Sequence, residues 1–393
     1  MDAAIDSVRL REVVAEHVDA GLVPGAVVAV SRGGRVWLDA VGRAAVDGPP
    51  MATDAVVRIS SMTKPLTAVL TLLLAQDGVL DLHDPVERWL PELVDRRVLR
   101  RLDGPVTATE PAEHRTTVED LLTMRMGFGF AFEVESCPVA DLAAAAGLGM
   151  GPPLPSAVPH SPDEWLARFA ELPLMEQPGR HWRYELAFAV LGVVLARAAG
   201  APLAQVMAER LLLPLGMADT GFAVPEHARS RLVPCYTADG AGGLALLDGV
   251  DDSDWLAAPS FPHAGGGLVS TAPDYLRFAR FVLAGGVHEG ARLLSGGAVA
   301  AMTTDQLTPA QRSGSSAGAF LDGGGWGYGV QVLSTGTGPS SRTSRFGWGG
   351  GLGTTWFAHP GHDTTAVLLT QCLPPPGPLV TAFWAALQEG LDD

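Results

Sequence analysis

The sequence predicts a two-lobed fold, in which an α/β lobe with a mainly antiparallel sheet surrounds a mostly helical lobe. Strand-like apolar runs lie near both ends of the chain, and helical apolar periodicity dominates the middle. Strands from the two ends must pair to form one sheet, so we expect a discontinuous α/β lobe. We place this lobe at about residues 1–65 and 225–393, and the helical lobe at about residues 66–224, within a single domain spanning 1–393.

The first expected elements are a helix and a β-hairpin. Apolar residues recur at the helical period from Val8 to Ala20. Two short apolar runs, at 25–30 and 36–41, flank a turn sequence at 31–34, which is typical of paired antiparallel strands.

Helical patterns dominate the middle of the chain. The expected helices cover residues 68–75, 117–122, 162–172, 187–199 and 202–213. Residues 126–163 are instead rich in Gly, Pro and Ala and show little periodicity. A long irregular run inside a compact domain is usually functional or mobile. We therefore expect a flexible insertion that covers or lines a substrate pocket, with Phe128 as a substrate-binding residue.

The C-terminal part returns to strands and closes with a helix. A helix is expected at about 273–283, with Thr271 as its N-cap. Strands are expected at 327–333, 353–358 and 364–371, a surface loop at 334–344, and a terminal helix at about 379–391.

Composition favours a globular protein with a large core and disfavours several classes of partner. The chain has 393 residues, of which 47% are hydrophobic and 18% charged. Its formal net charge is −16 and it has no basic run, so we expect no binding to nucleic acid or to an anionic membrane. The first residues lack the pattern of a signal peptide and no apolar run is long enough to span a membrane, so we expect a cytoplasmic protein.

Cysteine and histidine spacing gives no indication of a disulfide framework or a metal site. Cys137, Cys235 and Cys372 are far apart and odd in number, so we interpret them as free thiols. The ten histidines are dispersed and no His-x-x-x-His occurs, so no metal is expected.

Lys64 is the single lysine of the chain, whereas arginine occurs 26 times. A desolvated lysine amine can lose its proton and act as a base, but an arginine guanidinium stays charged. Ser61 lies three residues earlier, at the expected start of a helix, so both side chains should share one face. The pair indicates a serine nucleophile with a lysine base. The competing explanation is that one lysine survived by chance in an arginine-rich sequence, since a bare Ser-x-x-Lys is common.

Tyr184 is the best candidate for a proton donor and acceptor beside this pair. It is one of four tyrosines and lies in a turn that leads into the helix expected from residue 187. A phenol can both donate and accept a proton, and turns that enter helices often hold functional residues. The alternative is an ordinary aromatic residue packed at a helix start.

A glycine cluster at 347–353 lies at the start of an expected edge strand, where a substrate can approach the backbone closely. A backbone N–H near Gly351 could join that of Ser61 in an oxyanion hole. Trp348, Gly349 and Gly350 are the candidate substrate-binding residues, with Trp348 as an aromatic wall. The alternative is a bulge with a packed tryptophan.

These segments together resemble, in order and spacing, the serine β-lactamase superfamily. The matching motifs are Ser61-Met62-Thr63-Lys64, Pro178-Gly179 followed by Tyr184, Gly265-Gly266-Gly267-Leu268-Val269-Ser270-Thr271 and Trp348-Gly349-Gly350. The chain looks most similar to the class C-like branch of family VIII esterases and transesterases. This resemblance implies the fold of class C β-lactamases and penicillin-binding proteins. It also implies acylation of Ser61, with Lys64 and Tyr184 sharing the general base and acid work, and neither a metal nor an organic cofactor.

Two departures from class C β-lactamases bear on the substrate. Those enzymes carry Tyr-x-Asn where this chain has Tyr184-Glu185-Leu186, and Lys-Thr-Gly where it has Trp348-Gly349-Gly350. Both replaced positions normally hold the amide and carboxylate of a β-lactam, and each lost polar interaction costs about 1 to 3 kcal/mol. We therefore expect a small uncharged carboxylic ester as the substrate.

Several functions remain open at this stage. The first is ester hydrolysis through a Ser61 acyl-enzyme, and the second is acyl transfer to the alcohol or amine of a small metabolite. A weak β-lactamase, a D-amino-acid amidase or a D-amino-acid peptidase is a third possibility, and a non-catalytic binding protein on the same fold is a fourth. A monomer or a homodimer is expected.

Overall fold

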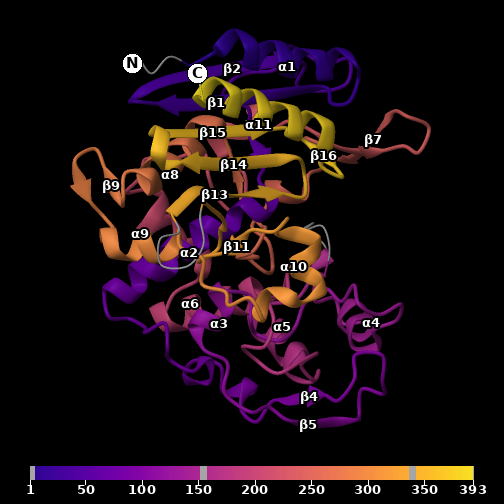
Figure 1. The fold of residues 1–393 in the computed structure, drawn as a ribbon. Helices are drawn as coiled ribbons and strands as arrows, with labels where there is room; N and C mark the ends of the chain where they lie inside the picture. Colours follow the sequence, from indigo (N-terminus) through magenta and orange to yellow (C-terminus); the bar gives the residue numbers. More distant parts are fainter. Residues whose placement is uncertain (1–4, 151–156, 336–341, 393) are drawn as a thin grey trace.

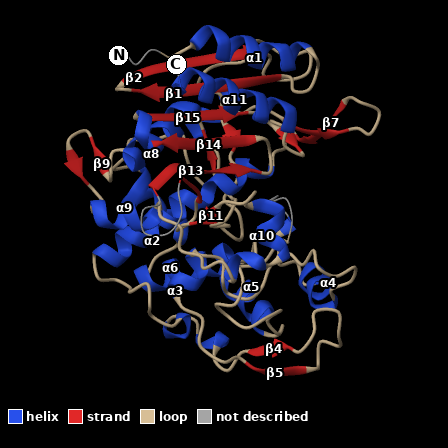
Figure 2. Ribbon diagram, in the orientation of Figure 1, coloured by secondary structure: helices blue, strands red, loops and turns tan. Residues whose placement is uncertain are grey.

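A computed structural model describes residues 5–150, 157–335 and 342–392 (Figures 1 and 2). Its largest element is a seven-stranded sheet in the order β11-β12-β13-β14-β15-β1-β2, with antiparallel neighbours throughout. The strands are β1 (Gly25–Arg32), β2 (Arg35–Gly42), β11 (Gly325–Trp326), β12 (Gln331–Thr335), β13 (Arg342–Gly350), β14 (Thr354–His359) and β15 (Thr364–Leu369). Strands from the early and late parts of the sequence thus form one sheet, as predicted.

Helices cover both faces of this sheet. On one face lie α1 (Ser7–Asp19) and α11 (Gly377–Asp392), and on the other α8 (Ala272–Leu283) packs against β1, β14 and β15 (Figure 1). Successive residues of a strand point to opposite faces. In β1, Val28 therefore packs with the α1 and α11 side chains, while Val27 packs in the main core with α8. This explains why β1 is apolar at both alternating positions.

The remaining α-helices are α2 (Thr63–Gln76), α3 (Val118–Leu122), α4 (Pro138–Ala145), α5 (Pro162–Ala170), α6 (Ala187–Ala199), α7 (Leu203–Met207), α9 (Gly296–Met302) and α10 (Ser315–Phe320). Those that Figure 1 labels lie mostly below the sheet in that view. The core helix α6 is buried from Ala187 to Leu195 and ends at Gly200, whose positive φ of 67° is the left-handed conformation expected of a C-cap glycine. The lobe boundaries near residues 65 and 225 stay a prediction.

Short strands complete the structure. They are β3 (Val57–Arg58) with β8 (Val269–Ser270), β4 (Arg97–Leu99) with β5 (Thr109–Pro111), β9 (Val287–His288) with β10 (Ala291–Arg292), and β6 (Cys235–Ala238) between β7 (Leu244–Asp248) and β16 (Cys372–Leu373). The β3–β8 pair matters for the site, because it joins the chain just before Ser61 to the segment that precedes α8.

Four expectations need correction. The insertion at 126–163 is not irregular throughout, since it contains α4 and the start of α5, although its residues 151–156 lie outside the described part. The strand expected at 327–333 is wrong in extent, because Gly329 takes a positive φ of 73° and turns the chain between β11 and β12. The surface loop expected at 334–344 is wrong at both ends, since β12 extends to Thr335 and β13 begins at Arg342. Residues 336–341 lie outside the described part.

The fourth correction concerns the strand expected at 353–358, which is β14 and lies inside the sheet rather than at its edge. Most of the glycines before it belong to β13, a strand that we did not predict. Its pairing with β12 ends at Gln331 and Gly347, whereas its pairing with β14 continues to Gly350. Residues 348–350 therefore have a paired strand on one side only among the described residues, and at this point the strand behaves as a local edge.

Among the helices of the described residues, none is by itself long and apolar enough to cross a membrane. The segments Ala187–Ala199 and Leu203–Leu212 meet the length and composition test together, but they are bent by 81° relative to each other.

Candidate active site

Ser61 lies in a 3-10 helix (Ser60–Met62) that leads directly into α2. The residues on either side of Ser61 are buried, whereas Ser61 is half-buried. In this segment, the Ser61 side chain is therefore the one that a substrate can reach. The segment is fixed to the chain before β8 by hydrogen bonds from Ile59 N to Leu268 O (3.0 Å) and from Thr67 Oγ1 to Ala264 O (2.7 Å).

The three side chains expected to be catalytic meet at the Ser61 hydroxyl. Lys64 Nζ lies 3.0 Å from Ser61 Oγ and also donates to Gly265 O at 2.8 Å. The Tyr184 hydroxyl donates to Ser61 Oγ at 2.8 Å. Lys64 is fully buried and Tyr184 is 5% exposed, so both reach the serine from inside the protein. The spacing in the sequence correctly predicted the Ser61–Lys64 contact, and the fold brings Tyr184 to the same oxygen.

Tyr184 is held by its backbone and by its ring. The preceding Arg183 N donates to Met124 O at 2.8 Å, and Phe130 N donates to Tyr184 O at 2.8 Å. The phenol ring stacks on Phe320 of α10 with the ring centroids 4.6 Å apart. These contacts hold the side chain before any substrate binds, which limits the conformational freedom that binding must remove.

Trp348 has a different contact from the one we expected. Its indole Nε1 donates to the Tyr184 hydroxyl at 3.0 Å, and its ring packs edge-to-face on Trp326 at 4.8 Å. The side chain is only 7% exposed. Trp348 therefore orients the tyrosine hydroxyl, and it offers a substrate less surface than an aromatic wall would.

The glycines after Trp348 pass close to the nucleophile segment. A Cβ at Gly350 would lie 2.4 Å from Ile59 O, and a Cβ at Gly351 would lie 3.8 Å from Ser60 Oγ. A side chain at Gly350 would clash with backbone, so glycine is required for this approach. The Gly351 backbone thus lies close to the Ser60 side chain, one residue before the nucleophile. Its role as the second oxyanion donor stays a prediction.

Phe128, the residue expected to touch substrate in the 126–163 insertion, is a core residue. It is fully buried and packs edge-to-face on Phe169 at 5.3 Å. Two residues later, Phe130 stacks on the Tyr184 ring at 6.2 Å, and the neighbouring Phe132 is 54% exposed. The insertion thus contributes aromatic side chains beside the site, but not the one we selected.

Two residues beside Lys64 were not identified from the sequence. Glu185 places its carboxylate Oε2 3.8 Å from Lys64 Nζ, and the residue is 6% exposed. His263 is buried, and its Nδ1 accepts the backbone N–H of Gly265 at 3.1 Å. The sequence held no signal for either residue: Glu185 occupies the variable position of Tyr-x-Asn, in which Leu186 replaces the asparagine.

Burial and the lysine charge together set the protonation of these neighbours. Burial raises the pKa of the Tyr184 phenol, and the Lys64 charge opposes part of this rise. Burial likewise raises the pKa of the Glu185 carboxyl, again opposed by Lys64. For His263, burial and the nearby Lys64 charge act in the same direction and lower the pKa to about 3, so this imidazole is neutral at ordinary pH.

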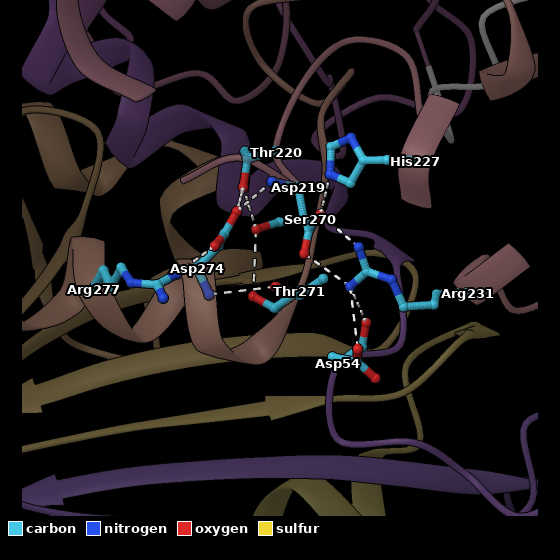
Figure 3. Close-up of polar contacts among 9 residues, drawn as sticks. All are labelled: Asp54, Asp219, Thr220, His227, Arg231, Ser270, Thr271, Asp274 and Arg277. Carbon is cyan, nitrogen blue, oxygen red and sulfur yellow. Dashed lines mark hydrogen bonds and ion pairs between the residues drawn. The ribbon is translucent and has the colours of Figure 1, made fainter. Parts of the chain in front are cut away.

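A second polar cluster lies at the start of α8 (Figure 3). Asp274 accepts hydrogen bonds from Asp219 N (2.8 Å), Thr220 Oγ1 (3.0 Å) and Arg277 Nη1 (2.6 Å), and Asp219 is paired with Arg231 at 2.6 Å. These groups are satisfied by one another, which indicates a structural role. Across the described residues, no group of three or more His, Cys, Asp or Glu side chains could hold a metal ion. The three cysteines are buried and free.

Comparison with known proteins agrees with this geometry. The family model described as "Beta-lactamase" matches residues 10–391. The chain belongs to the beta-lactamase family. Protein Rv1367c of Mycobacterium tuberculosis is 40% identical over 372 residues, covering 92% of this chain and 89% of that protein. Esterase EstB of Burkholderia gladioli is 32% identical over 391 residues, covering 94% and 92%.

Among solved structures of this beta-lactamase fold, EstCE1, a hydrolase with promiscuous acyltransferase activity, superposes with a TM-score of 0.79. The two are 25% identical, and the match covers 97% of this chain and 98% of EstCE1. These matches confirm the β-lactamase-like fold and the likeness to the esterase and transesterase branch.

Proposed function

We propose that this member of the beta-lactamase family hydrolyses carboxylic esters through an acyl-enzyme on Ser61. The observation that supports this most directly is the position of Ser61 Oγ, 3.0 Å from Lys64 Nζ and 2.8 Å from the Tyr184 hydroxyl. A serine hydroxyl is a weak nucleophile, and it needs a base at hydrogen-bond distance and a group that returns the proton. The names of the relatives EstB and EstCE1 support the same class of reaction.

In the proposed first step, the Ser61 proton passes to Lys64, and Oγ forms a bond to the carbonyl carbon of the ester. The negative charge that develops on the carbonyl oxygen is stabilised by the backbone N–H groups of Ser61 and Gly351. The bond from carbon to the alcohol oxygen then breaks, and Tyr184 delivers a proton to that oxygen while it recovers one from Lys64. The alcohol leaves, and the acyl group stays on Ser61.

In the second step, a water molecule takes the place of the alcohol. The same bases accept its proton, its oxygen attacks the acyl carbon, and the bond to Ser61 Oγ breaks as the proton returns to the serine. The carboxylic acid leaves, and the resting enzyme is restored. This scheme assigns general base and acid roles to Lys64 and Tyr184 together.

The side chains near the serine favour an uncharged, apolar ester over an anionic β-lactam. Trp348 stands where class C β-lactamases carry the lysine of Lys-Thr-Gly, and it bonds to Tyr184. Phe130 and Phe320 stack beside the tyrosine, and Phe132 adds exposed aromatic surface next to Phe320 at 5.9 Å. Aromatic surface stabilises apolar groups by burial, whereas a substrate carboxylate there would lose its hydration without a new partner.

The proposal is tested with p-nitrophenyl acetate and p-nitrophenyl butyrate. We expect release of p-nitrophenol by the wild type, with a transient mass increase equal to the acyl group, and neither in Ser61→Ala. A chromogenic cephalosporin should turn over far more slowly than these esters. Wild-type turnover that survives in Ser61→Ala, or a faster reaction with the cephalosporin, would refute the ester hydrolase proposal.

Acyl transfer to an alcohol or amine is the second candidate, because EstCE1 combines hydrolase and acyltransferase activities in one protein. Both reactions share the acyl-enzyme and differ in the acceptor that attacks it. The test is the ratio of transferred ester to free acid when a small alcohol is added to the p-nitrophenyl butyrate reaction. A rising share of new ester at constant p-nitrophenol release supports transfer, whereas free acid alone restricts the enzyme to hydrolysis.

A further inference from the structure

We propose that Glu185 is a positioning residue for the reaction, the buried counter-ion that stabilises the ammonium of Lys64 when it takes the proton of Ser61. The inference rests on the proposed acyl-enzyme function and assigns a role to a residue outside the Ser61, Lys64 and Tyr184 set. Its starting point is the 3.8 Å separation between Glu185 Oε2 and Lys64 Nζ inside the protein.

The lysine amine has two uncharged neighbours at hydrogen-bond distance and one acidic neighbour further away. Ser61 Oγ at 3.0 Å and Gly265 O at 2.8 Å are within hydrogen-bond distance, and both are uncharged oxygens. The carboxylate of Glu185 at 3.8 Å is too far for a hydrogen bond but close enough for a strong charge interaction where water is excluded. Glu185 therefore acts on Lys64 through its charge, and it does not pass a proton.

Few charges compete with this pair. His263 lies near Lys64 and is neutral, and the Tyr184 ring faces the amine with its centroid 4.5 Å from Nζ. The adjacent Arg183 points away, towards Glu176 and Glu133. Among the described residues, Lys64 is the one cation that forms an ion pair with Glu185, so removal of the carboxylate leaves the ammonium without a counter-charge.

The backbone of Glu185 is also unusual. Its φ is 144°, a region that favours glycine and that other residues rarely adopt. Such backbone strain persists where the surrounding structure enforces it, and it is common beside functional groups. Here it occurs at the residue that follows the tyrosine and whose carboxyl side chain is buried in the core.

The role predicts a specific effect on the pH profile. A carboxylate beside the amine stabilises the protonated form, so its removal lets Lys64 give up its proton at lower pH. The acidic limb of kcat/KM should therefore shift to lower pH in Glu185→Gln. The plateau of kcat/KM should fall as well, because the ammonium that forms during acylation has lost its counter-charge.

The experiment compares wild type, Glu185→Gln, Glu185→Asp and Glu92→Gln with p-nitrophenyl butyrate between about pH 5 and about pH 10. Glu92 pairs with Arg197 on the surface, so Glu92→Gln removes the same charge far from Lys64. We expect the acidic limb of Glu185→Gln to move down by about one pH unit or more and its plateau to fall about tenfold, with no shift in Glu92→Gln.

A purely structural role for Glu185 would lower the plateau and leave the limb in place, and that result would overturn the inference. If Glu185→Gln does not fold, Glu185→Asp provides the test. Aspartate keeps the carboxylate but is one methylene shorter, so the carboxylate lies further from Lys64 and the acidic limb of kcat/KM should shift down by a smaller amount. No shift of this limb would refute the role of Glu185. If the wild type shows no turnover that depends on Ser61, the proposed function itself is refuted. If the enzyme is active but the acidic limb of kcat/KM does not shift in Glu185→Gln, only the role of Glu185 is refuted.

Discussion

The segment from His263 to Asp274 takes part in two buried polar clusters that differ in how fully their groups are paired. At its far end, Asp274 accepts three hydrogen bonds of 2.6 to 3.0 Å within the cluster of Figure 3. At its near end, the Lys64 amine is 3.8 Å from the carboxylate of Glu185. In the same place, the buried Nε2 of His263 has no hydrogen-bond partner in the described part of the chain.

The difference in pairing indicates that one cluster stabilises the fold and that the other takes part in the reaction. A polar cluster whose members satisfy one another holds segments together and resists any change in protonation. A cluster whose groups are buried but incompletely paired is less stable, yet its protons can move when a substrate arrives. We therefore expect changes near Lys64 to affect rate and pH dependence, and changes around Asp274 to affect stability alone.

The largest effect is expected from Tyr184→Phe, which keeps the ring stack on Phe320 and removes only the hydroxyl. General acid and base groups contribute factors of about 10² to 10⁴, so kcat/KM should fall about 10³-fold, or about 4 kcal/mol. The matched control is Tyr236→Phe, because Tyr236 is also buried but bonds to Val46 N instead of Ser61. Equal losses in both variants would contradict a special role for Tyr184.

The next effect concerns His263 and acid. Because the pKa of His263 falls from 6.5 to about 3 in the folded state, the unfolded chain binds a proton that the folded chain excludes. The contribution to stability is complete above about pH 6.5 and is lost as the pH falls towards 3, by at most about 1.4 kcal/mol per pH unit.

In His263→Asn, the amide oxygen can still accept from Gly265 N but does not titrate. The fall of Tm between about pH 7 and about pH 4 should therefore be shallower than in wild type. The exposed His83→Asn serves as the control. Parallel Tm profiles for wild type and His263→Asn would show that His263 does not control the acid sensitivity.

Asp274→Asn tests the paired cluster. Asp219 N and Thr220 Oγ1 donate hydrogen bonds to the Asp274 carboxylate. In the variant, an amide NH₂ replaces one carboxylate oxygen and cannot accept a hydrogen bond, so the free energy of unfolding should fall by about 2 kcal/mol. The kcat/KM of the folded variant should stay within about twofold of wild type. The exposed Asp251→Asn is the control for stability. A large loss of kcat/KM with unchanged stability would contradict a purely structural role for the Asp274 cluster.

The smallest effect is expected from Trp348→Phe. The ring still packs on Trp326, but the hydrogen bond from the indole Nε1 to the Tyr184 hydroxyl is lost. A bond of about 1 kcal/mol corresponds to a loss of up to about tenfold in kcat/KM. The KM for p-nitrophenyl butyrate should change less than kcat. A rise in KM at constant kcat would instead indicate that Trp348 contacts the substrate directly.

The sequence predicted the parts of the fold and site that depend on neighbours along the chain. Ser61 and Lys64 meet because a helical start places residues three apart on one face. The hairpin of β1 and β2 and the end of α6 at Gly200 follow equally local rules.

The missed features depend on packing between distant segments. Glu185 and His263 come to Lys64 from separate loops, and no spacing in the sequence relates them. Phe128 and Phe130 are chemically alike, and only the packing of Phe169 against one and Tyr184 against the other separates core from site. Gly329 turns the chain within an apolar run that looked like a single strand.

The most direct test of the whole account is the rate of Ser61 acylation in Lys64→Arg, followed by intact mass and p-nitrophenol release with p-nitrophenyl butyrate. Arginine keeps the positive charge but cannot serve as the base. We predict no acyl adduct in Lys64→Arg under conditions that acylate the wild type, with circular dichroism used to confirm that the variant is folded. Acylation of folded Lys64→Arg at the wild-type rate would contradict the assignment of Lys64 as the base for Ser61.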